Sequence, residues 1–108
     1  MTLPKFLTRV ELHGARPDDY ARLHEAMKIR NFHNTIADDN GVAFQLPTAM
    51  YVSHGPAITV TQVRDLAVQA AKSTGLQHWV LVSEYNASAW VLRPISPISR
   101  VARVLGGG

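Results

Sequence analysis

The chain has 108 residues, of which 46% are hydrophobic and 18% charged, and its formal net charge is +3. That length suits one folded domain. The absence of cysteine excludes a disulfide framework, a thiolate zinc site and a cysteine nucleophile. No apolar run approaches the roughly 20 residues of a membrane span, and the first residues lack the apolar segment of a signal peptide. We therefore expect a cytoplasmic protein with no membrane contact.

The charge is unevenly distributed along the chain. Through residue 92, eight lysines and arginines balance eight aspartates and glutamates, whereas three arginines and no acids follow. A neutral body attracts nucleic acid weakly, and a basic end attracts it modestly. We expect a single domain over residues 5–93 and a basic, glycine-terminated tail over residues 94–108.

The first two elements can be predicted from their periodicity. Apolar and polar residues alternate over residues 6–13, which predicts a half-buried strand. Pro17 and the two aspartates after it favour a helix start, because proline suits the first helical turn and acids suit its positive end. Apolar residues at helical spacing then extend this helix to Arg30.

The second and third extended runs of the chain follow the first predicted helix, and the second continues after a turn. Residues 32–37 and 42–46 flank the sequence Asp38-Asp39-Asn40-Gly41, and Asn-Gly is typical of a tight hairpin turn. Residues 49–53 form the third run, which ends before a glycine and a proline. Asp38 and Asp39 could also ligate a hard cation, although a solvated hairpin is the simpler interpretation.

The last elements are a helix and a strand. Thr59 or Thr61 is a suitable cap for a helix whose apolar residues recur at helical spacing up to Gly75, a natural C-terminal cap. Residues 77–84 are hydrophobic at the centre, which predicts a strand inside the sheet, and residues 89–92 are expected to form a short edge strand. Both tryptophans are expected to be packing residues.

The predicted order is β-α-β-β-α-β. Two split βαβ units of this length favour an α+β, ferredoxin-like fold, in which two helices cover one face of a four-stranded antiparallel sheet. Many unrelated functions occur on this fold, so the topology does not identify the activity. No nucleotide-binding loop, nucleophile elbow or zinc-protease motif is present, and the five histidines match no metal motif, so we predict neither a metal nor a cofactor.

His24 and Tyr51 are the candidate catalytic residues. His24 borders the apolar stripe of the first predicted helix, and Tyr51 lies on the opposite face of its strand from both neighbours. Imidazole is the natural acid or base near neutral pH. Such groups, with a cation to hold the phosphate, suffice for metal-independent attack by an RNA 2′-hydroxyl. The alternatives are an ordinary half-buried histidine, and a tyrosine that either stacks on a base or packs beside Phe44.

Four further residues are candidates for RNA binding. Arg22 and Arg30 lie on the first predicted helix, where they can contact phosphate or remain solvated. His54 follows the strand that carries Tyr51, and Arg93 begins the basic end of the chain.

The middle of the chain resembles the GhoS-type endoribonuclease antitoxins of type V toxin–antitoxin systems. The resemblance covers about residues 5 to 92 and is carried by the run Phe32 to Val42, by Gln45-Leu46 and by Met50-Tyr51-Val52. It implies a ferredoxin-like, cytosolic RNA-binding protein that cleaves the messenger of a small membrane-lytic toxin. By position, it assigns RNA contacts to His24 and Tyr51, with Arg22 and Arg30 nearby.

The chain departs from related CRISPR-associated nucleases at the end of the first strand. Those enzymes place a metal-binding aspartate there, whereas this chain has His13-Gly14-Ala15. The alternative is a non-catalytic binding protein, such as a phage- or mobile-element-encoded inhibitor of a host or competing enzyme. A protein partner, or a second copy in a homodimer, would meet an exposed sheet edge, because unpaired edges associate readily.

Overall fold

The computed structural model describes residues 3–57 and 59–95. They form a small α+β fold with two helices, a three-stranded antiparallel sheet and a two-stranded sheet. The elements in chain order are β1 (Lys5–Leu12), α1 (Pro17–Ile29), β2 (Thr35–Ala37), β3 (Ala43–Gln45), β4 (Met50–Ser53), α2 (Val60–Lys72) and β5 (His78–Tyr85).

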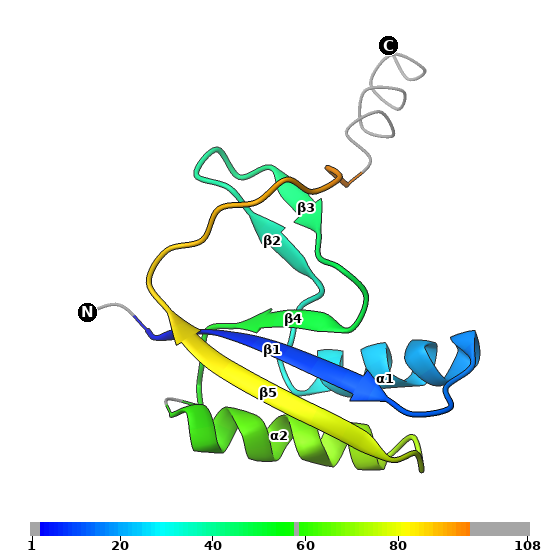
Figure 1. Cartoon of the computed structure of the whole chain (residues 1–108). Coiled ribbons are helices and arrows are strands. Elements are labelled where there is room, and N and C mark those ends of the chain that lie inside the picture. Colours follow the sequence, from blue (N-terminus) through cyan, green and yellow to red (C-terminus); the bar gives the residue numbers. More distant parts are fainter. Residues whose placement is uncertain (1–2, 58, 96–108) are drawn as a thin grey trace.

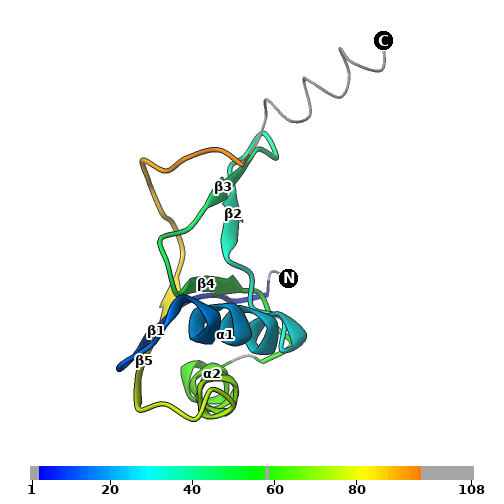
Figure 2. The same ribbon diagram turned by 90° about the vertical axis from the view of Figure 1, so that its right-hand side faces the viewer.

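The larger sheet has the order β4-β1-β5, with β1 in the centre. Thr8 lies opposite Tyr51 on one side and Val82 on the other, which fixes these three residues on the same face. Both helices cover that face, as Figures 1 and 2 show, while the β2-β3 hairpin projects away from the helices.

The core lies between this sheet face and the helices. The predicted alternation in β1 is confirmed, because Phe6, Thr8, Val10 and Leu12 are buried. The helices contribute the apolar stripes that their spacing predicted. The main buried residues they add are Leu23, Met27, Val63, Ala67, Ala70 and Ala71.

Hydrogen bonds and a glycine at the helix ends lie where the sequence indicates. The backbone N–H of Arg16 donates to Asp19 at the start of α1. Thr59, not Thr61, caps α2: its hydroxyl accepts from the N–H of Gln62 at 3.1 Å. Gly75 adopts φ +76° two residues after Ser73, the C-cap of α2.

The four-stranded sheet predicted from the sequence does not form. After α1, the chain touches β4 at one bridge, between His33 and Val52, and β2 then pairs with β3 instead. The tight turn predicted at residues 38–41 closes this hairpin locally, and Phe44 packs against Trp90, outside the main core. β2 and β3 therefore pair with each other within the hairpin, and Phe44 has its packing partner, Trp90, outside the main sheet.

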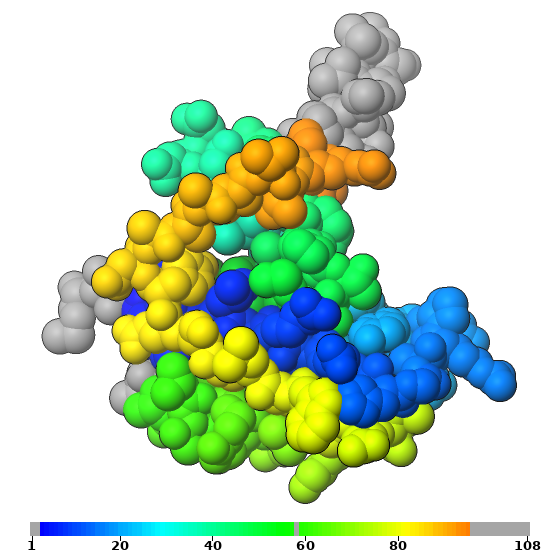
Figure 3. All heavy atoms as spheres, in the orientation of Figure 1, coloured from blue at the N-terminus to red at the C-terminus, as the bar shows by residue number. Residues whose placement is uncertain are grey.

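The end of the described chain also differs from the prediction. β5 is an edge strand, not an inner one, and Trp79 is 60% exposed, so its interpretation as a packing residue is wrong. Residues 89–92 form no strand; pairing with β3 begins at Arg93, whose carbonyl accepts from Gln45, and continues at Ile95. Figure 3 shows this segment running from β5 to the hairpin. The remainder of the predicted tail, residues 96–108, lies outside the described residues.

Candidate functional site

The structure brings His24 and Tyr51 together. His24 Nδ1 lies 2.5 Å from the Tyr51 hydroxyl oxygen, although the two residues are 27 positions apart. α1 supplies the imidazole and β4 supplies the phenol. The predicted proximity of the two groups is confirmed.

Tyr51 is not the exposed residue that the sequence interpretation required. Its side chain is 1% exposed and faces the core, because β4 pairs with β1 in a register that places Tyr51 beside Thr8. Its ring packs edge to face against Phe32, at 6.4 Å between centroids, and not against Phe44. The prediction that Tyr51 stacks on an RNA base is therefore wrong, and only the Tyr51 hydroxyl is available to position another group.

Burial shifts the protonation of both groups toward their neutral forms. Burial lowers the pKa of His24, and the nearby Glu25 carboxylate offsets this by raising it. Burial raises the pKa of Tyr51, and the neighbouring Tyr20 raises it further. At pH 7 the pair is therefore a neutral imidazole beside a protonated phenol.

The hydrogen bond restricts which nitrogen of His24 is free. When Nδ1 carries the proton, it donates to the Tyr51 oxygen, and Nε2 keeps a lone pair that can accept a proton. When Nε2 carries the proton, the phenol donates to Nδ1, and Nε2–H is a hydrogen-bond donor. Within the described residues Nε2 has no partner, so both states are open to a ligand.

His24 lines a small cleft of about 250 Å³, which we call the His24 cleft. Lys28 lies one helical turn after His24, so both side chains share a face of α1. His33 enters the cleft from the segment before β2. The full lining is His24, Glu25, Lys28, Phe32, His33, Asn34, Thr35 and Tyr51.

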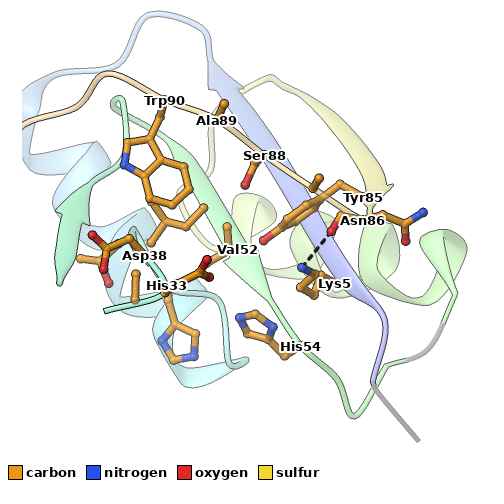
Figure 4. A pocket seen from close by; sticks show the side chains of 15 residues that line it. Lys5, His33, Asp38, Val52, His54, Tyr85, Asn86, Ser88, Ala89 and Trp90 are labelled. Carbon is orange, nitrogen blue, oxygen red and sulfur yellow. Dashed lines mark hydrogen bonds between the residues drawn. The ribbon is translucent and has the colours of Figure 1, made fainter. Parts of the chain in front are cut away.

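A larger hollow of about 680 Å³, the hairpin cleft, lies between β2, β4 and the segment after β5. Figure 4 shows the Trp90 and Tyr85 rings on one side and the His33 and His54 imidazoles on the other. Lys5 donates a hydrogen bond to the Asn86 carbonyl and lies 5.1 Å from the Tyr85 ring centroid. This mixture of aromatic, imidazole and charged groups suits a small polar ligand with a flat part.

The two clefts adjoin, because His33 and Thr35 line both. Their charges are mixed: Lys5 and Lys28 are opposed by Glu25 and by acidic residues of the hairpin turn. An anionic ligand would therefore depend on a few placed contacts more than on a broad positive field.

The predicted RNA-binding residues do not all gather at these clefts. His54 lines the hairpin cleft, but Arg22, Arg30 and Arg93 line neither. Arg22 forms an ion pair with Asp19. Arg30 donates to the carbonyl of Ala26 at 2.8 Å.

The hairpin turn accounts for Asp38. One oxygen of its carboxylate accepts the backbone N–H groups of Asn40 and Val42, each at 2.9 Å. This favours the hairpin interpretation over a cation site. In the described part of the chain, no group of three or more histidine, cysteine or acidic side chains converges, and no described helix is long and apolar enough to span a membrane.

Sequence reasoning missed four cleft residues: Lys5, Lys28, His33 and Tyr85. Lys28 could have been found from its spacing of four residues after His24. The other three come from segments that are distant in sequence, and only the tertiary structure brings them together.

Comparison with known proteins supplies no family assignment. No protein-family model matches the chain, and no curated protein shows significant similarity to it.

Proposed function

We propose that this protein binds single-stranded RNA across the two clefts and cleaves it through His24 without a metal ion. The observation that carries the proposal is the 2.5 Å contact that orients His24 while leaving Nε2 free in a cleft that also contains Lys28. A fixed imidazole beside a cation is the minimum equipment for transesterification at a phosphodiester.

In the proposed reaction, His24 Nε2 takes the proton of the RNA 2′-hydroxyl. The 2′-oxygen attacks phosphorus, and the bond from phosphorus to the 5′-oxygen breaks. An imidazolium at His33 gives its proton to the leaving 5′-oxygen, while Lys28 stabilises the negative charge on the phosphoryl oxygens. The products are a 2′,3′-cyclic phosphate and a 5′-hydroxyl. Tyr51 is a positioning residue in this scheme, because it is buried and touches only His24 among the cleft's imidazoles.

The hairpin cleft supports the binding half of the proposal. Its volume lies within the range of small-ligand sites, about 300–1,000 Å³, and accommodates one nucleotide. The Trp90 indole offers a stacking surface to an unpaired base. Since His33 lines both clefts, a strand bound here continues directly into the His24 cleft.

The chain connectivity supports a ferredoxin-like classification, which we propose with the function. The support is the order β5-β1-β4, followed by the bridge at His33, which agrees with the strand order that this fold would have if its second strand were reduced to one residue pair. The more specific proposal, an antitoxin that cleaves a toxin messenger, rests on the resemblance described above and not on the topology.

The test is an RNA-cleavage assay with a mixed single-stranded pool in EDTA at pH 6–8. The wild type should release fragments with 2′,3′-cyclic phosphate ends, and His24→Asn should lower the rate about 100-fold or more, as expected for loss of acid–base catalysis. Lys28→Gln should weaken both binding and cleavage. Lys72→Gln is the matched control, because Lys72 occupies the last turn of α2, outside both clefts.

The outcomes separate the two functions. Binding without cleavage by the wild type contradicts the nuclease and leaves an RNA-binding protein. If the wild type neither binds nor cleaves RNA, both functions are contradicted, and the alternative of a protein that acts by binding another protein is favoured.

A further inference from the structure

The outer edge of β5 is open. β5 has eight residues and lies at the side of the sheet remote from the hairpin (Figure 1). Within residues 3–57 and 59–95, no strand pairs with its outer side. The strand contains none of the lysines, prolines or bulges that commonly protect such edges, and it exposes Trp79 and Leu81.

The direction of the free backbone groups follows from two hydrogen bonds. His13 N–H donates to the Gln77 carbonyl at 2.8 Å, and Val10 N–H donates to the Ala49 carbonyl at 3.0 Å. Odd-numbered residues of β1 therefore bond toward β5, and even-numbered ones toward β4. Because this pattern alternates in antiparallel sheets, the β5 residues whose N–H and C=O groups point outward are His78, Val80, Val82 and Glu84.

We propose that β5 pairs antiparallel with β5 of a second copy of this chain, about a twofold axis at Leu81. In this register His78 lies opposite Glu84 of the second copy, and Val80 lies opposite its Val82. Each residue on the outward row thus meets a partner of matching character, an imidazole with a carboxylate and valine with valine. A twofold axis makes every such pair occur twice.

The polar residues at the two ends of the outward row select Leu81 as the centre. A twofold axis that keeps the helix-covered faces of both copies on the same side passes midway between the two copies of one β5 residue, which is the centre of the pairing. Centred at Val82, the pairing would place the Glu84 carboxylate opposite Val80. Centred at Val80, it would leave Glu84 opposite Leu76, beyond the strand. Of the registers centred at Val80, Leu81 and Val82, only the one at Leu81 places Glu84 opposite a polar side chain, His78, and it also brings the two exposed Leu81 side chains together.

This pairing is independent of the proposed RNA function. The His24 cleft contains no residue of β5. The hairpin cleft contains one, Tyr85, which is the last residue of the strand and lies four positions from the Leu81 axis, so the pairing meets that cleft only at its Tyr85 end. The dimer would therefore contain one continuous six-stranded sheet, with the two clefts of one copy at each end.

The first test measures the mass of the full chain by light scattering over a range of concentrations. We expect a concentration-dependent rise toward twice 11.9 kDa. Leu81→Lys places two like charges at the axis and should weaken the dimer at least tenfold. Ile29→Lys makes the same change at a 77% exposed residue of α1 and should leave the dimer unchanged. A monomer at all concentrations, or a dimer unaffected by Leu81→Lys, overturns the proposal.

The second test fixes the register by cross-linking, for which the absence of native cysteine is an advantage. The two Leu81 residues form a non-hydrogen-bonded pair with α-carbons about 4.5 Å apart, within disulfide range. Leu81→Cys should therefore oxidise to a covalent dimer. The two Ser83 residues would lie about 13 Å apart along the strands, so Ser83→Cys should not. Equal cross-linking of both variants overturns the register.

Discussion

Replacing Tyr51 with phenylalanine tests whether its hydroxyl positions His24. The substitution removes one oxygen and keeps the buried ring, with its packing against Phe32. The loss of one neutral hydrogen bond costs about 0.5–1.5 kcal/mol. The cost should fall in the lower part of that range, since His24 is only half-buried and lines the His24 cleft.

The effect on RNA cleavage should exceed what this stability change implies. Without its partner, the imidazole samples other rotamers, and kcat should fall about tenfold, equivalent to about 1.4 kcal/mol in the barrier. KM should change little, because Tyr51 is buried and does not contact RNA in the proposal. Single-turnover cleavage in EDTA, with thermal unfolding of the same samples, measures both effects.

Tyr20→Phe is the matched control. It also removes one phenolic oxygen with a hydrogen bond, here from the backbone N–H of Leu12 at 3.3 Å, but Tyr20 lines neither cleft. Both variants should lose similar stability, and only Tyr51→Phe should lose activity. Equal cleavage by the two variants, with His24→Asn inactive, would refute the positioning role of Tyr51.

Three other predictions concern pH, helix capping and salt. Since burial lowers the pKa of His24 in the folded state, the unfolded chain binds a proton at His24 more readily, and the free energy of unfolding should fall as the pH drops below about 6.5. Urea unfolding of the wild type and of His24→Asn between pH 7.5 and 5.0 measures this, and the variant should lose less stability over that range. The same pH profile in both proteins would contradict the prediction. Thr59→Ala should cost about 1 kcal/mol in urea unfolding through loss of the α2 cap, while Thr61→Ala, which removes no cap, should cost little; equal losses would argue against the cap. Lys28 lines the His24 cleft and Lys5 lines the hairpin cleft, so a strand that spans both clefts would meet one lysine in each. With these two lysines as its phosphate contacts, the logarithm of RNA affinity should fall with the logarithm of salt concentration at a slope of about −1.4, and a much steeper slope would place the RNA on a more basic surface.

Part of the candidate site could be predicted from the sequence. The position of His24 beside the apolar stripe of α1 is a local, periodic feature, and so is the opposite orientation of Tyr51 to its neighbours on β4. Which face of β4 the helices cover is a different matter, because it depends on pairing between Thr8 and Tyr51 across the sheet. Tyr51 was therefore expected on an exposed surface and is buried.

The sequence by itself determined the features that depend on neighbouring residues: the alternation in β1, a threonine cap at the start of α2, and the turn that closes the β2-β3 hairpin. Only the tertiary structure decided that β5 is an edge strand, that Trp79 is exposed, and that His33 joins two clefts. Local patterns reflect side-chain periodicity and backbone hydrogen bonds within a few residues. The order of strands depends on which distant segments bury each other's apolar surface, and a single strand does not contain that information.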